Sequence, residues 1–140
     1  MSSITQSDQS RNQITSDYDF TKLFLFNNKF RSVSITPSGE LEITIGTLIG
    51  QVSGVYQVYK SGTSNISFVG IAAETQTIAD AVAGTVNLCI SGKVNEDELV
   101  FDSTDDLDTV VSYIPIRDRI GASSVGIELV TSDELSKFDN

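Results

Sequence analysis

Short alternations of apolar and polar residues, each ended by a glycine or proline turn, recur along the chain and constrain its fold more than any other feature. Residues 41–45 read Leu-Glu-Ile-Thr-Ile and follow a Pro-Ser-Gly turn at residues 37–39. Such alternation places every second side chain on one face, as in a strand with one buried face. Strand-like segments of this kind are also found at 31–36, 47–52, 55–59, 66–71 and 85–90. Turns at intervals of about 8–12 residues predict a mainly β, single domain that resembles a small barrel or sandwich.

The carboxyl-terminal part changes character. Pro115 suits the first position of a helix, and either Gly121 or the Ser123-Ser124 pair can end it. Residues 125–130 resume a strand pattern, and residues 131–134 resemble a helix cap with acidic residues in the first turn. One or two short carboxyl-terminal helices are therefore expected. Residues 75–84 remain ambiguous between a short helix and an irregular crossover.

The first 19 residues have a different composition from the rest of the chain. Ser, Thr, Gln, Asn and Asp dominate them, with Ile4, Ile14 and Tyr18 as apolar side chains. Such a segment cannot bury enough apolar surface to offset the entropy lost on ordering. We therefore expect an extended arm at residues 1–19 and a β-rich domain at residues 20–140.

Aromatic residues are concentrated where the expected arm meets the domain. Four of the seven phenylalanines lie within residues 20–30, beginning with Phe20. The Asn27-Asn28 pair in this segment is a turn signal between strand-forming residues. Two interpretations stay open: a hairpin whose aromatic side chains belong to the core, and an aromatic patch that docks on a partner.

Charge excludes some classes of partner. The chain has 19 acidic and 9 basic residues and no histidine, which gives a net charge of −10. The basic residues look scattered singly along the sequence, so binding to nucleic acid or to an anionic membrane is not expected. The only cysteine, Cys89, lies in a strand-like run and is expected to be a buried structural thiol. No apolar run approaches the ~18 residues that span a bilayer, so a reducing, cytoplasm-like compartment is expected.

Candidate chemical motifs are weak. Residues 102–108 are rich in aspartate but lack the glycine and the bidentate glutamate of a calcium loop. The glycines at 46 and 50 are not followed by the lysine of a phosphate-binding loop. Glu96, Asp97 and Glu98 are adjacent rather than paired across a pocket. The sequence therefore predicts no enzyme, no metal site and no cofactor.

Several short motifs keep a recognisable order along the second half of the chain. They are 46–52 (GTLIGQV), 68–74 (FVGIAAE), 88–96 (LCISGKVNE), 107–111 (LDTVV), 116–120 (IRDRI), 126–127 (GI) and 139–140 (DN). In this order and spacing the chain resembles the head decoration proteins of tailed phages of the lambda type. Residues 20–45 carry an additional aromatic and strand segment ahead of the part that the resemblance covers.

The resemblance implies a virion structural protein, a capsid decoration or cement protein, on the outer surface of the phage head. It implies assembly in the host cytoplasm, a homotrimer at local threefold positions, and reinforcement of the capsid against packaged DNA. It also implies that the amino-terminal arm binds the major capsid protein by adding a strand to it. On this interpretation, the candidate capsid-binding residues are Ile4, Ile14, Tyr18 and Phe20.

Two other functions stay open from the residues alone. Tyr56, Tyr59 and Tyr113 offer aromatic faces on which sugars stack in a receptor- or glycan-binding module of the virion. A structural protein of the phage tail or neck is the other alternative.

Overall fold

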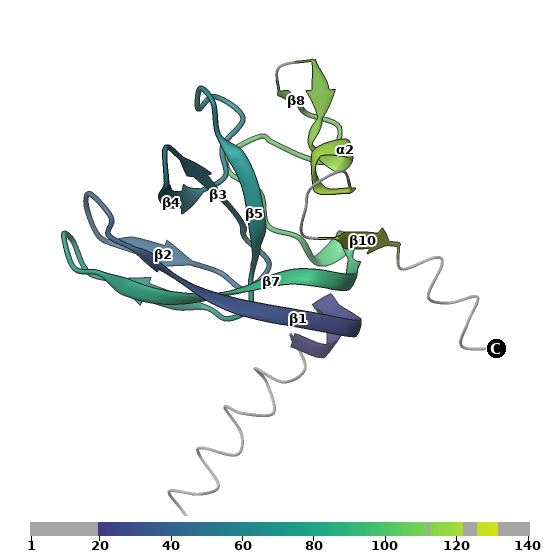
Figure 1. The fold of residues 1–140 in the computed structure, drawn as a ribbon, viewed down its shortest axis with the longest axis horizontal. Coiled ribbons are helices and arrows are strands. Elements are labelled where there is room, and N and C mark those ends of the chain that lie inside the picture. Colours follow the sequence, from purple (N-terminus) through teal and green to yellow (C-terminus); the bar gives the residue numbers. More distant parts are fainter. Residues whose placement is uncertain (1–19, 112, 122–125, 132–140) are drawn as a thin grey trace, which may run out of the picture.

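The computed structural model of the 140-residue chain describes residues 20–111, 113–121 and 126–131. The expected arm at residues 1–19, with Ile4, Ile14 and Tyr18, lies outside them, whereas Phe20 lies within. The described part is mainly β, as predicted (Figure 1). Residues 20–23 are helical and lead into the first strand. The elements that follow are β1 (Phe24–Ile35), β2 (Leu41–Ile43), β3 (Leu48–Val52), β4 (Val55–Val58), β5 (Ser67–Ala72), β6 (Gln76–Ile78), β7 (Gly84–Asn95), the 3-10 helix η1 (Glu96–Glu98), β8 (Val110–Val111), β9 (Ile114–Pro115), α2 (Ile116–Gly121) and β10 (Ile127–Val130).

One six-stranded sheet organises the domain. Its strands follow the order β1-β7-β5-β3-β4 with antiparallel neighbours, and β10 adds to β7 in parallel. The sheet is open rather than a closed barrel, because β1 and β4 share no backbone ladder. The Arg31 guanidinium instead reaches from β1 to β4, where its Nη2 donates to the Tyr56 hydroxyl at 2.6 Å. Two small two-stranded sheets, β2-β6 and β8-β9, lie outside the main one.

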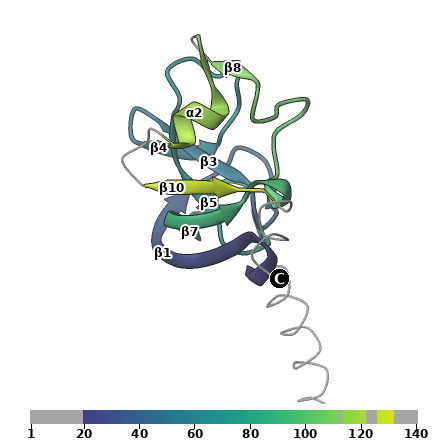
Figure 2. The ribbon, with the colours of Figure 1, turned by 90° about the vertical axis from the view of Figure 1, so that its right-hand side faces the viewer.

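Apolar clusters cover both faces of this sheet. Ile71 pairs with Cys89 and belongs to one cluster, whereas the next pair, Ala72 with Leu88, belongs to the other. Since neighbouring residues of a strand point to opposite faces, the two clusters lie on opposite sides. Ile43 and Ile78 of the β2-β6 pair complete one cluster. The other is completed by side chains of α2, β8 and β10, elements that Figure 2 shows stacked above β7.

The prediction of a hairpin at residues 25–30 is wrong. β1 is one continuous strand through the Asn27-Asn28 pair, and its register against β7 shifts there. Asn27 has a left-handed φ of 55°, which asparagine tolerates better than most residues. The same local chemistry that favours a turn therefore builds a β-bulge, because β7 supplies a partner along the whole length of β1.

The expectations for the carboxyl-terminal part are largely confirmed. α2 begins directly after Pro115 and ends at Gly121, and β10 lies within the strand expected at 125–130. The ambiguous segment 75–84 contains the short strand β6 followed by turns. The second helix expected after residue 131 lies outside the described residues.

Candidate partner-binding surface at the base of the arm

Phe20, the first residue of the predicted domain and a candidate capsid-binding residue, is anchored in an aromatic cluster. Its ring centroid lies 4.8 Å from that of Phe24 and 5.5 Å from that of Phe30, and Phe24 and Phe30 meet edge to face at 5.3 Å. These are favourable distances for tilted and edge-on aromatic pairs. The neighbouring Leu23 is fully buried in the core. Any segment that precedes Phe20 therefore starts from a residue that is packed against β1.

The β-bulge beside this cluster is held by side-chain and backbone contacts to β7. The Asn28 Nδ2 donates to the Lys93 carbonyl at 3.0 Å and to the Ser91 carbonyl at 3.4 Å. Gly92 has a φ of +104°, and a Cβ at this position would lie 2.6 Å from the Asn27 carbonyl oxygen. Only glycine accommodates so close an approach of the two backbones. The bulge thus fixes the direction of the β1 side chains around it.

Two phenylalanines next to the bulge face solvent. Phe26 is 69% exposed, and Phe30 is 41% exposed although its ring packs on the aromatic cluster. In the register with β7, Phe26 pairs with Lys93 and the next pair is Lys29 with Ser91. Directly opposite residues of an antiparallel pair are side-chain neighbours. We name Phe26, Lys29, Phe30 and Lys93 the arm-base patch.

The charge of this region departs from the expectation of scattered cations. Residues 20–39 and strand β7 contain no Asp or Glu, yet they carry four of the nine basic residues: Lys22, Lys29, Arg31 and Lys93. Lys22 pairs with Glu98 at 3.0 Å, whereas Lys29 and Lys93 form no ion pair with a described residue. Glu128 lies opposite Lys93 on β10 and is the nearest carboxylate by strand pairing. A cationic, aromatic surface therefore interrupts a strongly acidic molecule.

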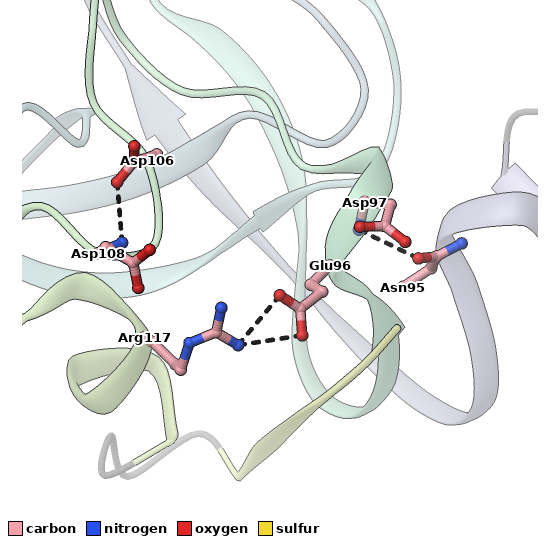
Figure 3. Close-up of polar contacts among 6 residues, drawn as sticks. All are labelled: Asn95, Glu96, Asp97, Asp106, Asp108 and Arg117. Atoms are coloured by element: carbon pink, nitrogen blue, oxygen red, sulfur yellow. Dashed lines mark hydrogen bonds and ion pairs between the residues drawn. The ribbon is translucent and has the colours of Figure 1, made fainter. Parts of the chain in front are cut away.

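The acidic segments at residues 96–98 and 102–108 make contacts within the fold (Figure 3). The Glu96 carboxylate accepts from Arg117 Nη1 at 3.0 Å, a contact that links η1 to α2 and raises the pKa of Arg117. Asn95 caps η1 by accepting from the Asp97 amide at 3.1 Å. Asp106 accepts from the Asp108 amide at 2.9 Å and thereby closes a tight turn. These contacts stabilise the loops that carry the carboxylates.

Groups that could perform chemistry are not brought together. Within residues 20–111, 113–121 and 126–131, no cluster of three or more potential metal-ligating side chains occurs. Asp105 in the acidic loop accepts from the Ser61 amide and hydroxyl at 2.9 and 2.6 Å. Cys89 is buried as expected, and burial raises the pKa of its thiol above the ordinary value of 9.0. Its hydrogen bonds with Asn28 and the Ser91 carbonyl lower this pKa, but desolvation outweighs them and disfavours the thiolate.

The three tyrosines singled out as sugar-stacking candidates have different surroundings. Tyr59 is only 3% exposed and packs edge to face on Phe68, so its ring cannot meet a ligand. Tyr56 is half-buried under the Arg31 guanidinium, which lies 5.9 Å from the ring centroid. Tyr113, at the turn between β8 and β9, is 97% exposed. Only Tyr113 of the three offers a free aromatic face.

Comparison of the chain with protein-family models and with curated proteins gives no match. In the part of the chain that the structure describes, the helices are too short or too polar to cross a membrane.

Sequence reasoning located part of this surface. The aromatic density at residues 20–30 pointed to it, and the structure places Phe20 in the cluster. Lys29 and Lys93 were missed because they lie far apart in sequence, and only the β1–β7 pairing brings them together. The absence of carboxylates from residues 20–39 was the available signal.

Proposed function

We propose that the chain is a virion structural protein that decorates and stabilises the outer surface of a phage capsid. Residues 1–19 bind the major capsid protein as an extended arm, and the domain assembles as a trimer at local threefold sites. The observation that carries this proposal is the anchoring of Phe20 on Phe24 and Phe30, at the point where the arm joins strand β1.

This anchoring suits a protein whose arm must hold it on a capsid under mechanical load. Strand β1 pairs with β7 from Phe24 opposite Val94 to Ile35 opposite Gly84. A pull on Phe20 passes through the helical residues 20–23 to β1, which this ladder holds along its length. Each hydrogen bond of the ladder adds roughly 1 kcal/mol net to stability. A polar arm that orders on the partner can supply backbone hydrogen bonds there, and three arms in one trimer act together through effective concentration.

Deleting residues 2–18 tests the proposal directly. The truncated protein keeps Phe20 and the whole described domain, so we expect it to fold and to lose binding to capsids. Binding is measured by co-sedimentation with expanded, undecorated heads of the phage that encodes the chain, with full-length protein as control. Heat resistance of the decorated heads provides a second readout. Undiminished binding by the truncated protein would contradict the role of the arm.

A receptor- or glycan-binding module remains the second candidate, because Tyr113 is almost fully exposed at a hairpin tip. This function predicts binding on a glycan array that Tyr113→Ala abolishes, without any affinity for heads. A tail or neck protein would instead label the other end of the particle when tagged protein is imaged on virions.

A further inference from the structure

Resting on the proposed function, we infer that the arm-base patch is a second contact with the same capsid protein, and that the surface it meets is acidic with an apolar hollow. The patch consists of Phe26, Lys29, Phe30 and Lys93. The arm contributes backbone pairing, and the patch contributes side-chain contacts that position the domain on the shell.

The first step is the continuity between arm and patch. The arm can only leave the domain at Phe20, and the Phe20 ring lies 5.5 Å from that of Phe30. A protein that holds the arm is therefore brought close to the end of β1 that carries the bulge. Once the arm is bound, a weak second contact forms at high effective concentration and adds to the overall affinity.

The second step is the chemistry of the face. Phe26 and Phe30 expose aromatic surface beside two lysines that form no ion pair with a described residue. In a chain with a net charge of −10, this cationic face is the region where an acidic partner meets the least repulsion. Exposed aromatic side chains are typical anchors of protein interfaces and fill apolar hollows.

The third step concerns the mode of contact. β1 is an edge strand, but its register shifts between Phe24 and Phe30. Bulges and lysines at an edge oppose the addition of another strand. The patch therefore binds through its side chains, whereas strand addition belongs to the arm.

The test uses full-length variants with an intact arm. Lys29→Glu and Phe26→Ser change exposed side chains, so their thermal unfolding should match that of the parent protein. We expect each to weaken co-sedimentation with expanded heads about tenfold. Lys60→Glu makes the same charge change at an exposed lysine outside the patch, and Val55→Ser removes an exposed apolar side chain from β4; both should bind like the parent.

Ionic strength gives an independent readout. Screening shortens the range of the lysine contacts, so parent binding should weaken as salt rises from about 0.1 to about 1 M. The Lys29→Glu variant should not weaken in this way.

The outcomes separate the two proposals. If the parent protein binds no heads, the proposed function itself is wrong. If the parent binds and the arm deletion abolishes binding, but Lys29→Glu and Phe26→Ser bind normally, only the patch inference is wrong. Retention of a single-stranded oligo-dT by the parent, lost in Lys29→Glu, would identify a nucleic acid as the occupant and overturn the inference as well.

Discussion

Single residues at the bulge decide whether β1 and β7 can approach. Gly92→Ala adds a Cβ 2.6 Å from the Asn27 carbonyl oxygen at a φ of +104°. We expect a loss of about 2–4 kcal/mol from the free energy of unfolding, measured with urea. Gly39→Ala is the matched control, since its φ is +92° but nothing lies within 4 Å of the added Cβ. Its cost should be about 1 kcal/mol; equal costs at both sites would show that the backbone contact is unimportant.

The Cys89 thiol links stability to pH. Burial raises the pKa of this thiol in the folded state, so the unfolded chain ionises first as pH rises. The stabilisation is complete below the ordinary pKa of 9.0 and is lost progressively above it. Urea unfolding between pH 8 and 10 should therefore show a steeper fall in the parent protein than in Cys89→Ala. Identical slopes would indicate that the thiol contributes nothing to the pH dependence.

At the scale of elements, the local sequence pattern predicted a strand or helix correctly where the residues of that element alone determine its conformation. Pro115 indicated the start of α2, Gly121 was one of two expected ends, and the alternation at residues 41–45 predicted β2. The bulge in β1 was mistaken for a hairpin because Asn27 and Asn28 favour either geometry. The choice depends on β7, which is more than fifty residues away in the chain. The residues around Asn27 and Asn28 carry no information about a pairing with so distant a strand.

The helix α2 is short, and its stability must come from packing rather than from its own hydrogen bonds. Ile120 is fully buried in the cluster that α2 helps to cover. Ile120→Ala should cost about 2–5 kcal/mol of unfolding free energy, measured by urea denaturation. Ile114→Ala, on the neighbouring β9 and exposed, should cost much less. Similar losses from both variants would mean that α2 is not part of the core.

The molecule as a whole has two ends of different character. Figure 1 places β1 at the bottom of the domain and β8 at the top. The β8-β9 hairpin exposes the apolar side chains of Val110, Tyr113 and Ile114. Contact of such a group with water is unfavourable, and exposed apolar groups of this kind often mark interaction sites. Lys29 and Lys93 of the arm-base patch come together only through the pairing of β1 with β7. No periodicity in the sequence marks the β8-β9 hairpin as exposed. Neither surface could therefore be predicted in full from the sequence alone.

The exposed apolar side chains of the β8-β9 hairpin are a candidate contact for the proposed trimer. If copies associate through it, sedimentation equilibrium should give a mass three times 15.1 kDa for the full-length protein. The paired substitution Val110→Ser and Tyr113→Ser should shift the protein to a folded monomer that still unfolds cooperatively, because both side chains are exposed in the single copy. The melting temperature should fall only by the contribution of assembly. Val82→Ser, an exposed apolar residue between β6 and β7, should leave the trimer intact. A trimer that persists in the hairpin variant would place the self-contact elsewhere, and a monomeric parent would remove the trimer from the proposal.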